Sequence, residues 1–233
     1  ILNGNIAAFG DEAKREAKSL GMNAESKPDL LLAPPLVDPH SILEEPINGR
    51  CENLKTLKNA AANSGYGQIA LLPRSKASRD SPESFSTLSS NSGDIVIHFW
   101  GNFSKEAKGK KLSSHYELIK HGAIGLADDD WLIDISILNK GLLLGEMGRS
   151  PILLAPRDKF IQGEGIVREG VETLRAGWPS DPKESEILPL QQILALNKQY
   201  PKRSIRIMNI STKESVSAIK HATDKIMSSV NWW

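Results

Sequence analysis

The stretch Leu36-Val37-Asp38-Pro39-His40-Ser41-Ile42 decides how this chain folds in our interpretation. Side chains two positions apart on a strand project from the same side. A strand that ends in Asp-x-His-x-His therefore directs two imidazoles toward one point, where they can bind a single zinc ion. Here His40 supplies the first imidazole, whereas Ile42 occupies the second position and has no lone pair to donate. The segment predicts half of a metal site.

Composition restricts the class of protein. The chain has 233 residues, of which 39% are hydrophobic and 24% charged, so we expect a folded α/β chain with a sizeable core. The net charge of +1 argues against nucleic acid as a partner. No apolar run reaches the roughly 20 residues needed to cross a membrane. The single cysteine, Cys51, fits a reducing compartment, and we expect a cytoplasmic protein.

Apolar runs and helix-period segments alternate along the sequence. The expected strands are Asp29–Leu36, Gln68–Leu72, Asp94–Trp100, Ala123–Ala127, Pro151–Ala155, Ser204–Ile210 and Lys225–Asn231. The expected helices are Asn53–Ser64, Ser81–Ser90, Leu112–His121, Trp131–Met147, Ser185–Gln199 and Lys213–His221. Such alternation predicts right-handed βαβ units and a parallel sheet. Seven strands leave two architectures open: an open doubly wound sheet, or a (β/α)8 barrel that stops before its eighth strand.

Several strings resemble, in order, motifs of the dihydroorotase family of the amidohydrolase superfamily. They are Asn3–Gly10, Leu32–His40, Leu43–Pro46, Asp80–Glu83, Gly122–Asp129, Glu169–Gly170 and Ile210–Val216. The resemblance implies an α/β fold, a TIM-like (β/α)8 barrel cut before the eighth strand. It also implies part of a small N-terminal β-domain at residues 1–32 and an incomplete barrel at residues 33–233. We therefore expect the chain to be a fragment.

The family's chemistry, implied by this resemblance, uses two zinc ions that activate a bridging hydroxide to attack a cyclic amide. Transferred position by position, the ligands that remain are His40 and the acidic pair Asp128 and Asp129. The other ligand positions hold Ile42, Leu154 and Asn209. Catalytic zinc normally has three protein ligands, so we expect zinc to be absent or weakly bound.

The positions that grip the substrate carboxylate in the family are also altered. Glu44 stands where the family has arginine, and Arg74 where it has asparagine. A glutamate directed into the site repels an anionic substrate. Our hypothesis is that Glu44 and Arg74 pair with each other and close the pocket.

Simpler interpretations stay open for these residues. A lone His40 is, without the family context, more often a hydrogen-bonded structural histidine than a ligand. The run Asp128–Asp130 is usually a solvated loop or a helix cap. Its place after a barrel strand, where active sites are built, favours a function.

Two functions follow from the resemblance. One is an active dihydroorotase or cyclic amidohydrolase of pyrimidine biosynthesis with an altered metal site. The other is a non-catalytic homologue that keeps the barrel for assembly, with aspartate transcarbamoylase or a second copy of the chain as partner. The replaced ligands favour the second.

Overall fold

The computed structural model describes residues 6–23, 29, 33–45, 51–75, 78–86, 94–128, 130–222 and 226–230. The chain divides into two units, Ile1–Pro34 and Pro35–Trp233. The expected boundary between residues 32 and 33 stays a prediction. The described part of the first unit holds helix α1 (Gly10–Ser19), where we expected β structure. The hairpin expected at Asn3–Gly10 falls partly outside the described residues.

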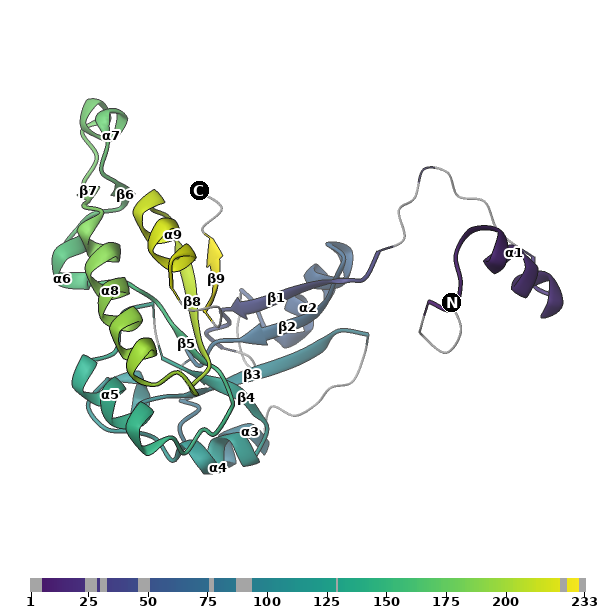
Figure 1. Cartoon of the computed structure of the whole chain (residues 1–233), viewed down its shortest axis with the longest axis horizontal. Helices are drawn as coiled ribbons and strands as arrows, with labels where there is room; N and C mark the ends of the chain where they lie inside the picture. Colours follow the sequence, from purple (N-terminus) through teal and green to yellow (C-terminus); the bar gives the residue numbers. More distant parts are fainter. Residues whose placement is uncertain are drawn as a thin grey trace. The chain divides into compact units, whose positions relative to one another are not determined.

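The second unit is built on a curled parallel sheet (Figure 1), seven-stranded within the described residues. Its spatial order is β1-β2-β3-β4-β5-β8-β9, and each neighbouring pair is parallel. The strands are β1 (Leu36–Ser41), β2 (Tyr66–Leu71), β3 (Val96–Asn102), β4 (Ala123–Ala127), β5 (Ile152–Leu154), β8 (Ile205–Ile210) and β9 (Met227–Val230). Strands that follow one another in the chain lie side by side, as they do in a (β/α)8 barrel. The barrel-type prediction is confirmed.

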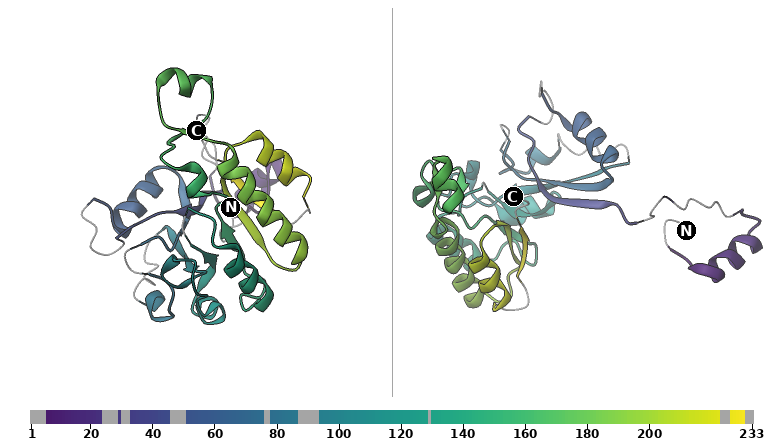
Figure 2. Two further views of the ribbon diagram at one scale, coloured as in Figure 1. Left: turned by 90° about the vertical axis from the view of Figure 1, so that its left-hand side faces the viewer. Right: turned by 90° about the horizontal axis from the view of Figure 1, so that it is seen from above.

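Helices connect successive strands and cover the outer face of the sheet (Figures 1 and 2). They are α2 (Leu54–Asn63), α3 (Glu83–Ser86), α4 (His115–Lys120), α5 (Ile135–Leu144), α8 (Glu184–Gln199) and α9 (Lys213–Lys220), with a 3-10 turn η1 (Lys105–Ala107). Capping sets several of their limits. Asn53 accepts hydrogen bonds from the backbone N–H groups of Lys55 and Thr56 at the start of α2. No helix in the described residues is long and apolar enough to cross a membrane.

The bounds of several expected elements differ from the structure, and two of the differences have a clear physical reason. The first strand begins at Leu36, not Asp29, and extends to Ser41. Pro34 and Pro35 lack N–H groups for a strand ladder, so pairing with β2 starts after them. Helix α5 is shorter than expected, because the Asp134 side chain caps its first turn and Gly145 ends it in a left-handed conformation.

The segment between β5 and α8 was not anticipated. It contains α6 (Lys159–Gln162), α7 (Val171–Ala176) and two two-residue strands, β6 (Val167–Arg168) and β7 (Ser180–Asp181), which pair with each other. Figures 1 and 2 show α7 with β6 and β7 standing out beyond the neighbouring helices.

The core consists of two layers on opposite faces of the sheet. The outer layer joins strand side chains such as Ile69 and Leu154 to the helix side chains Leu138 and Ile193. The inner layer consists of the buried residues Ala70, Leu72, Trp100, Ala127, Leu153, Ala155 and Met208. Alternate strand residues therefore supply the two layers, as the pleat requires.

Candidate functional site

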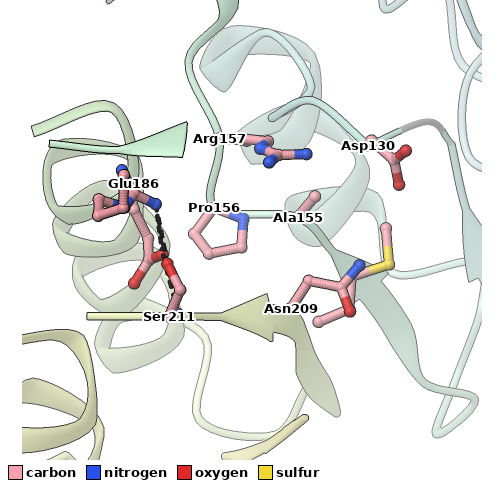
Figure 3. Close-up of a pocket in the computed structure, with 9 residues that line it drawn as sticks. Asp130, Ala155, Pro156, Arg157, Glu186, Asn209 and Ser211 are labelled. Carbon is pink, nitrogen blue, oxygen red and sulfur yellow. Dashed lines mark hydrogen bonds and ion pairs between the residues drawn. The ribbon is translucent and has the colours of Figure 1, made fainter. Parts of the chain in front are cut away.

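A small cavity lies at the carboxyl ends of β5 and β8, where a parallel barrel carries its active site (Figure 3). It encloses about 20 Å³, which is room for about one water molecule. Its walls are Asp130, Ala155, Pro156, Arg157, Arg168, Glu186, Met208, Asn209 and Ser211. Of the residues expected at the metal centre, Asn209 lines this cavity.

His40 is held by a hydrogen bond at the position where a metal ligand was expected. Its Nε2 lies 2.8 Å from the Ser229 hydroxyl of β9. The same hydroxyl accepts the backbone N–H of Asn209 at 3.0 Å. Asn209 has φ of 60°, a left-handed conformation that asparagine tolerates better than most residues. Ser229 therefore links β1 to β8, and the His40 nitrogen already has a partner.

Asp128, the expected carboxylate ligand, is 4% exposed and is bound to the loop after β3. Its Oδ1 accepts the backbone N–H of Ser104 at 2.9 Å, and its Oδ2 accepts the Ser104 hydroxyl. Through these hydrogen bonds Asp128 connects the end of β4 to the loop that follows β3. Asp129 lies outside the described residues.

Two of the three remaining ligand positions, 42 and 154, carry side chains with no lone pair to donate to a metal. Ile42 is 39% exposed after the end of β1. Leu154 is buried in the outer layer against the helices, whereas its neighbour Ala155 lies in the inner layer and lines the cavity. Leucine, alanine and isoleucine offer only hydrocarbon at these places.

A zinc centre does not fit these residues. Among the residues that the structure describes, no group of three or more His, Cys, Asp and Glu side chains could hold a metal ion. A catalytic zinc site needs three such ligands and an open position.

Glu44 and Arg74 line one pocket of about 500 Å³ between the loops after β1, β2 and β3. The ion pair of Arg74, however, is with Asp130, with 2.6 Å between Nη1 and Oδ2. The expected Glu44–Arg74 pair is not among the ion pairs of the described ranges. Asp130 reaches Arg74 across the strand ends, which sequence spacing could not show.

An ionic network under the cavity was missed by the sequence analysis. The Arg168 guanidinium lies 3.0 Å from Glu186 and 3.2 Å from Asp181. Glu186, 2% exposed, also accepts the backbone N–H groups of Ser211 and Thr212, each at 3.0 Å. It joins α8 to the end of β8. No spacing pattern signals it, because its members belong to separate elements.

The pKa of Glu186 results from opposing effects. Burial raises it, but hydrogen bonds from Ser211, Ser215 and Thr212 outweigh burial and hold the pKa below the ordinary value. Glu186 is therefore an ionised structural anion rather than a proton donor at neutral pH.

Bulky side chains fill the inner face of the sheet. Trp100 is 2% exposed, and its indole N–H donates to the carbonyl of Pro39 at 2.9 Å. Met208, fully buried, lies in the same inner layer. The Trp100 indole is thus bonded to the residue that precedes His40.

Comparison with known proteins agrees with this fold. No family model matches the chain. A "Probable dihydroorotase-like protein" of Synechocystis is 29% identical over 231 residues, covering 88% of this chain and 52% of the relative. Other curated relatives that match are named dihydroorotase. The chain spans about half the length of the curated relatives it matches.

Two solved structures share the fold. L-hydantoinase from Arthrobacter aurescens superposes with a TM-score of 0.65 at 15% identity, over 85% of this chain and 47% of that one. The inactive dihydroorotase-like domain of a Chaetomium thermophilum CAD-like multifunctional protein gives 0.52 at 14% identity, over 84% and 51%. The fold is therefore the barrel fold of these two structures. The sequence is similar to those of proteins named dihydroorotase or dihydroorotase-like, as its motifs predicted.

Proposed function

We propose that this chain is a non-catalytic dihydroorotase-like protein that keeps the barrel scaffold and has lost the metal centre. The observation that carries the proposal is the hydrogen bond between His40 Nε2 and the Ser229 hydroxyl. A metal ion and this hydroxyl compete for the same lone pair when that nitrogen is unprotonated. The residual ligands His40 and Asp128 thus each have protein partners, and Asp129 stays a predicted ligand.

The ligand position on β5 also belongs to this proposal. The sequence alignment assigned it to Leu154, but that side chain faces the helices. We assign it instead to Ala155, which faces inward and borders the same cavity as Asn209. With either assignment, an aliphatic side chain occupies the position where the family has a histidine.

The alternative is an active cyclic amidohydrolase with an altered metal site. Its support is that related proteins bear the name dihydroorotase. Glu44 and Arg74 are then altered substrate-binding residues, and they do line one pocket.

Metal analysis and an activity assay separate the two functions. The protein is purified with zinc in every buffer, its zinc content is measured, and hydrolysis of dihydroorotate is followed. We expect much less than one zinc per chain and no turnover. A His40→Ala variant is the matched control, and it should hold the same trace of zinc. Near-stoichiometric zinc that His40→Ala removes, together with turnover, would establish the alternative.

As a non-catalytic homologue, the protein would act by assembly, and we propose aspartate transcarbamoylase as its partner. Support comes from the segment around α7, which exposes Ile166, Val171, Leu174 and Trp178 by 58–74%. Exposed apolar patches mark interaction surfaces. The cytoplasmic location also stays a prediction.

Co-elution with the aspartate transcarbamoylase of the same organism tests this assembly. Leu174→Ser should abolish a complex that forms with the unaltered chain. Leu143→Ser is the control, because Leu143 is similarly exposed (66%) but lies on α5. Self-association of the chain that Leu174→Ser abolishes, without binding to the transcarbamoylase, would replace this partner by a second copy.

A further inference from the structure

A second, larger hollow lies outside the strand-end cavity, between the loops after β3, β4 and β5 and the first half of α8. Its volume is about 900 Å³. This falls within the range of pockets that hold small organic ligands. Arg157 borders both this groove and the small cavity. The groove adjoins the pocket of Glu44 and Arg74, since Ala107 and Lys108 line both, but it contains neither of those two side chains.

The acidic side chains of this groove are engaged by their own loops. Asp134 accepts the backbone N–H of Ser136 at 2.8 Å, and Asp158 accepts that of Phe160 at 2.8 Å. Hydrogen bonds from Ser136 hold the pKa of Asp134 below its ordinary value. Asp128 is bound to Ser104, as described above. Donors within the protein thus satisfy the hydrogen bonding of each carboxylate, and each keeps its negative charge.

The basic side chains of the groove are not compensated in this way. Lys110, Arg157 and Lys159 all line it. None of the three belongs to an ion pair within the described parts of the chain. Lys108, a fourth lining cation, is paired with Glu106. The groove therefore presents three cations without an acidic partner.

Flat and apolar surface lies next to these cations. The Arg157 guanidinium is 5.8 Å from the centre of the Trp131 ring, and Lys159 Nζ is 5.3 Å from that of Phe160. Phe160 is 86% exposed and Leu188 50% exposed on the same groove. Exposed aromatic rings offer faces on which a planar ring can stack, worth about 1–3 kcal/mol for a nucleic-acid base.

We propose that this groove binds an anion joined to a planar ring, of the class of nucleoside monophosphates. The phosphate contacts Arg157, Lys110 and Lys159, and the base stacks on Trp131 or Phe160. Guanidinium and phosphate form paired charge-assisted hydrogen bonds, which are the strongest contacts of this kind. The proposed contacts involve no zinc, although Asp128, an expected metal ligand, also lines the groove.

Calorimetric titration with adenosine 5′-monophosphate and uridine 5′-monophosphate tests the proposal, with adenosine and inorganic phosphate as the two halves. At least one nucleotide should bind with a dissociation constant below about 1 mM at low salt. Adenosine alone and inorganic phosphate alone should each bind at least about tenfold more weakly than the nucleotide. Raising the salt to about 0.5 M should weaken nucleotide binding, because exposed charges are screened.

Variants locate the site. Arg157→Gln should weaken nucleotide binding about tenfold and Lys110→Gln about threefold. Arg149→Gln is the matched control, since Arg149 is exposed on another face and should leave affinity unchanged. Far-ultraviolet circular dichroism confirms that each variant is folded. The proposal would be overturned if neither nucleotide binds, or if adenosine or inorganic phosphate alone binds as tightly as the nucleotide. It would also be overturned if Arg157→Gln and Lys110→Gln both leave the affinity for the nucleotide unchanged.

Discussion

The Ser229 hydroxyl forms hydrogen bonds at the position where the family resemblance implies a metal ion. It contacts a side chain of β1 and a backbone N–H of β8, although it belongs to β9. A metal would join the same elements through stronger bonds. Here hydrogen bonds of Ser229 to His40 and Asn209 do so.

Replacing this hydroxyl should cost stability. Ser229→Ala leaves the N–H of Asn209 without its acceptor and His40 without its partner, so the free energy of unfolding should fall by about 1–2 kcal/mol. Urea denaturation measures the change. Ser228→Ala, at the exposed neighbour, should have little effect. Equal effects of the two substitutions would contradict this role.

Glu186 has a larger predicted effect, because its removal leaves a cation partly buried. Glu186→Gln should lower the free energy of unfolding by about 2–3 kcal/mol at pH 7, less than for a fully buried pair since Arg168 is 27% exposed. Glu184→Gln, at an exposed position of the same helix turn, should change it by less than about 0.5 kcal/mol.

The pH dependence gives an independent check on Glu186. Its folded pKa lies below its ordinary value of 4.5, so the unfolded state takes up the proton first as the pH falls. The stability that the carboxylate provides is present above pH 4.5 and is lost below it. The difference between wild type and Glu186→Gln should therefore shrink in acid. A constant difference from pH 7 to pH 3 would refute the assignment.

At the scale of elements, strand β4 illustrates how tightly the inner layer is packed. Gly125 lies between the Trp100 ring and the carbonyl of Pro151. A β-carbon at this position would be 2.4 Å from each of them. Only glycine allows β4 to approach both groups so closely.

Gly125→Ala should therefore destabilise the chain by about 1–3 kcal/mol, the usual cost of overpacking, or more because one neighbour is backbone. Thermal unfolding followed by circular dichroism measures it. Gly170→Ala is the control, since a β-carbon there meets nothing within 4 Å. Similar melting temperatures for Gly125→Ala and wild type would show that β4 can shift to make room.

Elements with strong local signals were predictable from sequence. The apolar period located α2, and apolar runs located β4 and β8. The β6–α7–β7 segment was missed, because two-residue strands and a six-residue helix carry too little periodicity. Which face Leu154 occupies was also beyond sequence, since a shift of one position exchanges the two faces of a strand.

At the scale of the whole second unit, ion pairs at the strand ends were the least predictable part. Arg74 pairs with Asp130, 56 positions away, rather than with Glu44. The family resemblance directed attention to the strand ends, and the ligand positions that it assigns stay predictions. The resemblance could not predict the ion-pair partner of Arg74, because that partner depends on how loops far apart in the sequence come together in the fold.

Stability of the fold as a whole should fall in mild acid. His115 is 1% exposed, with Nε2 2.7 Å from the Phe103 carbonyl, and burial holds its pKa below the ordinary 6.5. The unfolded state therefore binds a proton before the folded state does, so stability rises with pH through this window. Unfolding free energies at pH 7 and pH 5 should differ less in His115→Gln than in wild type. An unchanged difference would assign the acid sensitivity to other groups.

The 20 Å³ cavity at the ends of β5 and β8 has a consequence for any attempt to engineer a two-metal site here. Grafting histidines at 42, 155 and 209 would restore the donor atoms but not the room that two cations and a hydroxide occupy. Met208 lines this cavity and would first have to be replaced by a smaller side chain, at the expense of the packing it provides. We therefore expect a variant with the three histidines and a smaller residue at 208 to be less stable than the present chain.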